Sequence, residues 1–136
     1  MGTQLTGRCK CGYEGVAYIA SGRANHGKVF KYPHYCKTCL SLTSIDILSD
    51  SQLCNECGSA DVHSYEAPTR TLSYKSLLNK LPTEILRKAG YHRSEEVHEE
   101  TFCYPINKRF VFLRKPHFCP RCKENSLHFF TSMLFD

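Results

Sequence analysis

The chain has 136 residues, with nine cysteines and a formal net charge of +5, a length that suits one ordinary domain or two very small ones. The first residues, MGTQLTGRCKCG, lack the apolar segment of a secretory signal, and the longest apolar runs are far shorter than the roughly 20 residues of a membrane-spanning helix. We therefore expect a cytoplasmic protein with no membrane partner, whose cysteines stay reduced.

Eight of the cysteines form four close pairs, which are Cys9/Cys11, Cys36/Cys39, Cys54/Cys57 and Cys119/Cys122. Such pairs are hard to close as disulfides, but they suit a turn that points two thiolates at one metal ion. Four pairs imply two sites of four cysteines, and we expect two Zn²⁺ ions per chain. Each zinc site of this kind carries a net charge of −2, so two sites would lower the formal +5 to about +1.

The first half of the chain reads as three strands. Residues 13–20 and 28–32 are strand-like and are separated by SGRANHG, whose glycines and asparagine suit a hairpin tip. Residues 40–48 alternate apolar and polar side chains, as in a half-buried strand. The polar residues 49–52 then read as a linker, so we predict a first domain at residues 1–52.

In the second half, residues 53–136, 61 residues lie between Cys57 and Cys119, far more than two strands need. Residues 60–67 and 108–115 read as an outgoing and a returning strand, and residues 126–134 as a final strand. Between them we predict a helical insertion at about 68–107. Apolar side chains at helical spacing mark residues 74–89, although Pro82 interrupts the pattern; they are Leu77, Leu78, Leu81, Ile85 and Leu86. Residues 94–100 read as a further short helix.

A repeated phrase bears on how the cysteine pairs share metals. PHYCKTC at residues 33–39 returns as PHFCPRC at 116–122, and each half also contains a cysteine pair followed by glycine, CKCG or CNECG. The repeat favours a sequential pairing, with Cys9/Cys11 joined to Cys36/Cys39 and Cys54/Cys57 joined to Cys119/Cys122. A nested pairing stays open, in which Cys36/Cys39 and Cys54/Cys57 share one metal across 14 residues and the outer pairs share the other.

These motifs resemble zinc ribbons, in which two cysteine knuckles clamp a three-stranded antiparallel sheet, as in transcription elongation factors and RNA polymerase subunits. The resemblance covers residues 8–48 and only the ends of the second half. It implies a small metal-stabilised fold, mainly β with an α insert: two tandem zinc ribbons, the second carrying the helical insertion. Ribbons serve many purposes, so no function follows from the resemblance.

The expected metal sites are structural. Four thiolates close the tetrahedron and leave no position for water, so we predict a non-catalytic protein. CKCGY also resembles the iron protein rubredoxin, which leaves iron as a minor alternative. An enzyme using Cys103, His92 or His98, as a thiol or metal-dependent hydrolase or nuclease, is the least supported hypothesis. We expect packing roles for His34 and His117, because each site already has four cysteines.

We predict that the chain binds DNA or RNA through basic ribbon surfaces. The candidate contacts are Arg23, Lys28, Lys108, Arg109, Arg114, Lys115, Arg121 and Lys123. Phenylalanines at positions 110, 112 and 118 are interleaved with the later ones, a mixture used on single strands. The alternative hypothesis is a scaffold that binds a protein partner, or a second copy of itself, through the helical segment 74–89.

Overall fold

The computed structural model describes residues 2–65, 70–71 and 80–136, the pair 70–71 by backbone only. The described chain forms two units, residues 1–65 with 116–136 and residues 66–115. The predicted boundary at residue 52 does not separate them, because the last residues of the chain return to the first. The predicted insertion at 68–107 lies inside the second unit.

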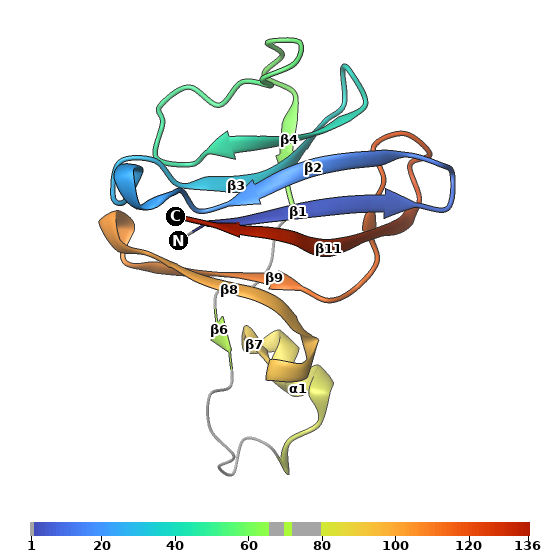
Figure 1. The fold of residues 1–136 in the computed structure, drawn as a ribbon. Helices are drawn as coiled ribbons and strands as arrows, with labels where there is room; N and C mark the ends of the chain where they lie inside the picture. The colour runs from blue at the N-terminus through green and yellow to red at the C-terminus, as the bar shows by residue number, and fades with distance from the viewer. Residues whose placement is uncertain (1, 66–69, 72–79) are drawn as a thin grey trace. The chain divides into compact units, whose positions relative to one another are not determined.

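The first unit is built around the pairing of the two ends of the chain. A four-stranded antiparallel sheet has the order β10-β11-β1-β2. Its strands are β10 (His117–Phe118), β11 (Asn125–Phe135), β1 (Gly2–Cys9) and β2 (Glu14–Ile19). β1 pairs with β11 from Gly2↔Phe135 to Cys9↔Leu127, so the two termini lie side by side (Figure 1). Sequence reasoning missed β1, whose residues GTQLTGRC include few large apolar side chains.

A three-stranded sheet completes the first unit. It has the order β4-β3-β5, from β3 (Lys31–Cys36), β4 (Ser41–Asp46) and β5 (Val62–Ser64), and it follows the 3-10 turn η1 (Arg23–Asn25). The two sheets are tied by side chains: the backbone N–H of Tyr18 donates to the Ser44 hydroxyl at 2.8 Å, and that of Leu42 to the Tyr13 hydroxyl at 2.6 Å. The buried side chains of this unit include Leu5, Ala17, Ile19, Tyr32, Ile45 and Leu127.

An aromatic cluster brings the two PH-aromatic-CxxC motifs together. The rings of Tyr35 and Phe118, which hold the same position in the two motifs, lie 4.9 Å apart. Tyr65 packs against Tyr35 at 5.2 Å and against His117 at 5.5 Å, and its hydroxyl donates to the Phe118 carbonyl at 2.9 Å. The two copies of the repeated motif therefore pack against each other, between the β3–β4 hairpin and the β10–β11 hairpin.

The second unit is mainly β where it is described. The backbones of β6 (Arg70–Thr71) and β7 (Tyr91–His92) form a parallel pair, and β8 (Val97–Cys103) and β9 (Lys108–Leu113) form a hairpin joined by the 3-10 turn η4 (Tyr104–Ile106). The helix α1 (Thr83–Lys88) has six residues, and η3 (Ser94–Glu96) leads into β8. The predicted short helix at 94–100 is thus wrong beyond Glu96, where the strand begins.

The apolar helical face predicted at 74–89 is only partly described. Leu77 and Leu78 lie outside the described residues, and α1 begins after Pro82, as the proline predicts. Leu86 is buried, whereas Leu81 and Ile85 are exposed. Within the described chain, no helix has the length and apolar character needed to cross a bilayer.

Candidate metal centres

The structure groups the eight paired cysteines into two clusters, in the nested arrangement. Cys9, Cys11, Cys119 and Cys122 form metal site 1, and Cys36, Cys39, Cys54 and Cys57 form metal site 2. Within each cluster all four sulfurs lie within 4.8 Å of one another. The sequential pairing is therefore wrong. Each site still combines one PH-aromatic-CxxC knuckle with one glycine knuckle, so the repeat identified equivalent knuckles but not their partners.

Strand pairing explains why the nested arrangement forms. Cys9 on β1 pairs with Leu127 on β11, and this register brings the tip of the β1–β2 hairpin close to the turn between β10 and β11. These two turns carry the four cysteines of metal site 1. In metal site 2, register Cys36↔Val62 between β3 and β5 brings the turn after β3 to the turn before β5. The end-to-end pairing involves β1, the strand that the sequence pattern does not reveal.

The spacing of the sulfurs fits a tetrahedral metal. The Sγ atoms of Cys9 and Cys122 are 3.6 Å apart, and those of Cys11 and Cys119 are 3.8 Å apart. In metal site 2 the Cys36–Cys57 and Cys39–Cys54 sulfur pairs are each 3.6 Å apart. Zinc binds thiolate sulfur at about 2.3 Å, so two corners of its tetrahedron lie roughly 3.8 Å apart. Both clusters could hold a metal ion and are compatible with zinc.

Each knuckle has the same backbone signature. The residue after the second cysteine has a positive φ in all four: Gly12 at 90°, Leu40 at 54°, Gly58 at 72° and Lys123 at 63°. The amide of Gly12 donates to the Cys9 carbonyl at 3.0 Å, and that of Lys123 donates to the Cys119 carbonyl at 2.9 Å. Glycine adopts this conformation without steric cost at two of the knuckles. Leu40 and Lys123 adopt the same conformation without the freedom of glycine.

Serine hydroxyls supply polar contacts to the sulfurs that sequence reasoning missed. The Ser126 hydroxyl lies 3.0 Å from the Cys9 sulfur, and the Ser41 hydroxyl lies 2.8 Å from the Cys39 sulfur. A signal for them exists in the sequence, because Ser-Leu lies within the first three residues of the strand after each PH-aromatic-CxxC knuckle, as Ser41-Leu42 and Ser126-Leu127. The leucines of both pairs are buried, which fixes the serines beside the metal sites.

Within each cluster the pKa of one thiol is lowered and that of another is raised. The pKa of Cys9 is lowered to about 6, because the Cys11 backbone N–H and the Ser126 hydroxyl donate to its sulfur. Burial alone would raise the pKa of Cys36, but backbone N–H groups of Cys39 and Thr38 lower it to about 6. Burial raises the pKa of Cys119 to about 12. One thiol of each cluster thus ionises readily, and a dication would stabilise four thiolates together.

The two histidines of the repeat pack in the interior. His34 and His117 are buried, and both metal clusters consist of cysteine alone. The Nδ1 atom of His34 lies 2.8 Å from the Tyr32 carbonyl, and burial lowers the pKa of its ring. The rings of His117 and Phe129 meet edge to face at 5.3 Å. These contacts position the strands that lead into the second knuckle of each repeat.

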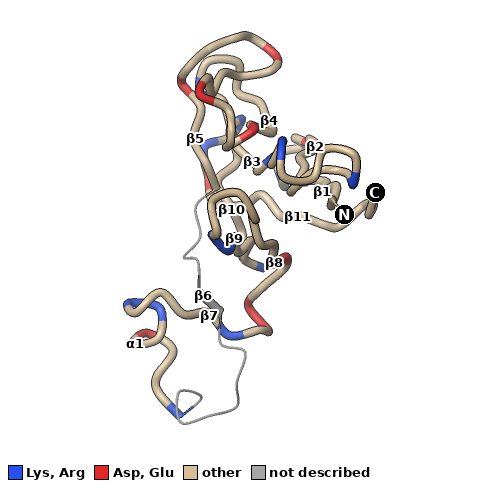
Figure 2. Tube along the Cα trace, turned by 90° about the vertical axis from the view of Figure 1, so that its left-hand side faces the viewer, with Lys and Arg blue, Asp and Glu red and all other residues tan. Residues whose placement is uncertain are grey.

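The predicted nucleic-acid contacts are divided between the units, and basic residues occur along the whole trace (Figure 2). Arg23, Lys28, Arg121 and Lys123 belong to the first unit, and Lys108, Arg109, Arg114 and Lys115 belong to the second. All eight are exposed. Two have acidic partners, since Arg23 pairs with Asp136 at 3.3 Å and Arg109 pairs with Glu100 at 2.6 Å.

Two of the three phenylalanines predicted to contact nucleic acid pack inside their units. Phe112 is only 1 % exposed, and Phe118 packs against Tyr35, so these rings belong to the packed interior of their units.

Cys103, at the end of β8, is also buried, at 1 % exposed. His92 lines a pocket in the second unit, and Cys103 is not among the lining residues.

Comparison of the chain with models of protein families, with curated proteins and with solved structures finds no match. The two four-cysteine clusters are consistent with the zinc-ribbon resemblance.

Proposed function

We propose that the protein is a non-catalytic, zinc-stabilised binding module. The observation that carries this proposal is the closed geometry of the two clusters, in which four sulfurs within 4.8 Å of one another supply every ligand of a tetrahedral ion. A zinc ion in such a site has no open position for substrate or water. The metals then act on the fold, by joining hairpins that are distant in sequence.

The ligand we propose is single-stranded nucleic acid, bound by basic residues around metal site 1. The knuckles of this site carry Lys10, Arg121 and Lys123, all exposed. Lys10 pairs with Glu124 at 2.9 Å, whereas Arg121 and Lys123 make no ion pair with any described residue. Two unpaired cations on one rigid turn can meet successive phosphates without first breaking a salt bridge.

Lys28 is a separate candidate contact, because the loop after η1 lies at the end of β1 opposite to metal site 1. It is exposed and has no acidic partner among the described residues, unlike Arg23, which is held by Asp136. We therefore assign Lys28, Arg121 and Lys123 the larger share of the phosphate contacts in this unit. Binding of this kind is largely electrostatic, so it depends steeply on salt and weakly on base sequence.

The test is fluorescence anisotropy with labelled single-stranded DNA and RNA, using protein that holds two zinc ions. The logarithm of the binding constant should fall with the logarithm of salt concentration, by roughly 0.7 per phosphate contacted. Replacing Arg121 and Lys123 by glutamine should weaken binding and make that slope shallower. The charge-matched control replaces Lys80 and Lys88 by glutamine, since both are exposed and lie in the other unit. No binding at low salt, or equal losses in both variants, would refute the proposal.

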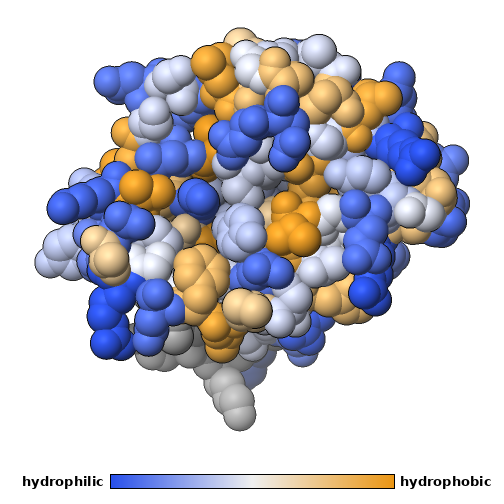
Figure 3. Space-filling view, turned by 45° about the horizontal axis from the view of Figure 1, so that its top comes forward, coloured by the Kyte–Doolittle hydropathy of each residue, from blue (hydrophilic) through white to orange (hydrophobic). Residues whose placement is uncertain are grey.

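A second candidate, protein interaction, is favoured by exposed apolar side chains on β11. Phe130, Met133 and Leu134 are 54 %, 56 % and 61 % exposed. On the face drawn in Figure 3, the apolar surface patches are small and are separated by hydrophilic side chains. Analytical ultracentrifugation of the chain and of Phe130→Gln tests self-association. A concentration-independent monomer in both would remove a second copy as the partner.

A further inference from the structure

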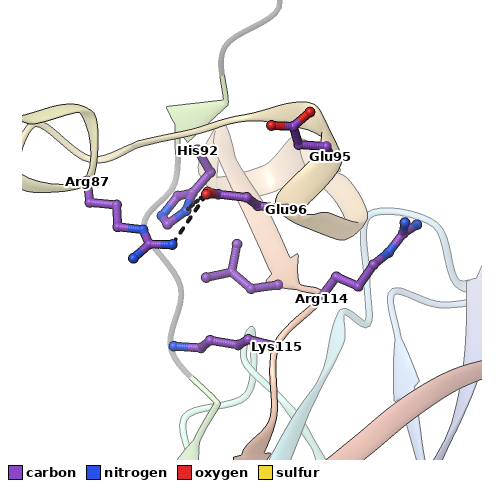
Figure 4. Close-up of a pocket in the computed structure, with 7 residues that line it drawn as sticks. Arg87, His92, Glu95, Glu96, Arg114 and Lys115 are labelled. Carbon is purple, nitrogen blue, oxygen red and sulfur yellow. Dashed lines mark hydrogen bonds and ion pairs between the residues drawn. The ribbon is translucent and has the colours of Figure 1, made fainter. Parts of the chain in front are cut away.

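The second unit contains a pocket that no part of the proposed function uses. It has a volume of about 450 Å³, within the range of small-molecule sites. Its polar lining comes from α1, β7, η3 and the residues after β9, and consists of Arg87, His92, Glu95, Glu96, Arg114 and Lys115. Figure 4 shows Arg87 and Lys115 reaching toward the side of the pocket where the His92 ring lies, while Arg114 extends along the other side.

The buried imidazole in this pocket lacks a hydrogen-bond partner. His92 is 4 % exposed, and neither Nδ1 nor Nε2 has a hydrogen bond within the described chain. The nearest charged group is the Glu96 carboxylate, 3.5 Å from Nδ1. A buried polar ring without a partner is unfavourable, and a ligand oxygen in the pocket would supply the missing acceptor.

The cations of the pocket are only partly neutralised. Glu96 pairs with Arg87 at 3.3 Å. Glu95 lies 4.0 Å from Arg93, a residue that does not line the pocket. Arg114 and Lys115 have no ion pair with a described residue. Two carboxylates, Glu95 and Glu96, therefore line the pocket with three cations and an imidazole, which leaves a positive balance in a concave site.

We propose that this pocket binds a phosphate monoester. A phosphate dianion offers several acceptor oxygens, enough to contact Lys115, the Arg87 guanidinium and the His92 ring at once. A singly charged carboxylate would meet fewer of these donors. The group could come from a free small molecule, such as a nucleoside monophosphate, or from the terminal phosphate of an oligonucleotide.

The experiment is a titration of the full-length, zinc-loaded protein at low ionic strength. Inorganic phosphate and adenosine monophosphate are followed by calorimetry and by NMR of the histidine rings. Both ligands should bind saturably and shift the ring signals of His92. Lys115→Gln should weaken binding roughly tenfold, the loss expected for one hydrogen bond to a charged group. Lys108→Gln, an equal change of charge on β9 outside the pocket, should alter it less than twofold.

A comparison of oligonucleotides with and without a 5′-phosphate identifies the source of the group. A His92 shift that requires the terminal phosphate supports capture of a strand end. A shift with adenosine monophosphate alone supports a free metabolite. The proposal is overturned if phosphate leaves the His92 signals unchanged, or if Lys115→Gln and Lys108→Gln weaken binding equally. Because Arg121 and Lys123 lie in the other unit, their variants test the nucleic-acid proposal separately.

Discussion

The positive φ at every knuckle gives a prediction whose sign depends on the residue present. Gly12 and Lys123 both follow the second cysteine of a knuckle in metal site 1, at φ values of 90° and 63°. A left-handed conformation costs a residue with a Cβ atom about 1–2 kcal/mol. Glycine avoids that cost, but it makes the unfolded chain more flexible, which removes about 0.4–1 kcal/mol of stability. The two effects leave a net difference of roughly 1 kcal/mol in favour of glycine at these positions.

Gly12→Ala should therefore lower the free energy of unfolding by roughly 1 kcal/mol. No heavy atom lies within 4 Å of the added Cβ, so the loss comes from the backbone and not from a clash. Lys123→Gly should raise the free energy of unfolding by about the same amount relative to Lys123→Ala, which removes the same charge but keeps the strain.

The assay is denaturant unfolding at a fixed free zinc concentration, because metal binding and folding are coupled. Zinc affinity, measured by competition with a chelator, should change in the same direction as stability. If Lys123→Gly is no more stable than Lys123→Ala, or if Gly12→Ala has no effect, the turns do not carry the strain that we infer.

The remaining predictions concern the interior, one histidine and the metals. Tyr65→Phe removes the hydrogen bond to the Phe118 carbonyl and should cost about 1 kcal/mol of unfolding free energy; Tyr104→Phe, at a side chain 70 % exposed, should be neutral in the same assay. Burial lowers the pKa of His98, and the Arg114 guanidinium lowers it further. Arg114→Gln should thus raise that pKa in an NMR titration. Because protonation of His98 is disfavoured in the fold, stability should fall as the pH drops below its unfolded value of about 6.5. Removal of both metals should unfold the first unit, since structural zinc contributes on the order of 10 kcal/mol per site, and circular dichroism after stringent chelation checks this.

Local patterns in the sequence were sufficient for the knuckles and for the strands β2, β4, β5, β9 and β11. The spacing of cysteine pairs identified the eight residues of the two clusters that could hold metal ions, and the alternation of apolar residues in 40–48 predicted β4. The glycines after Cys11 and Cys57, which the repeat identified, occupy positions of positive φ. These features depend on residues close together in the chain, where the spacing of side chains and the chemistry of turns are enough.

The pairing of the knuckles depended on a contact between the two ends of the chain. β1 is a central strand bordered by β2 and β11, and it contributes Thr3, Leu5 and Cys9 to the interior, too few large apolar residues to mark a strand. Without β1, nothing local connects Cys9 with Cys119. Likewise, residues 94–100 resemble a capped helix in their charges, but the hairpin pairing of β8 with β9 determines their structure.

Metal content of two double variants tests the nested pairing most directly. Cys11→Ser with Cys122→Ser removes two ligands from metal site 1 alone, whereas Cys11→Ser with Cys39→Ser removes one ligand from each site. Elemental analysis of purified protein, supported by the absorption of cobalt-substituted samples, counts the four-thiolate sites. The nested pairing predicts one metal in the first variant and none in the second. One metal in the second variant and none in the first would contradict it.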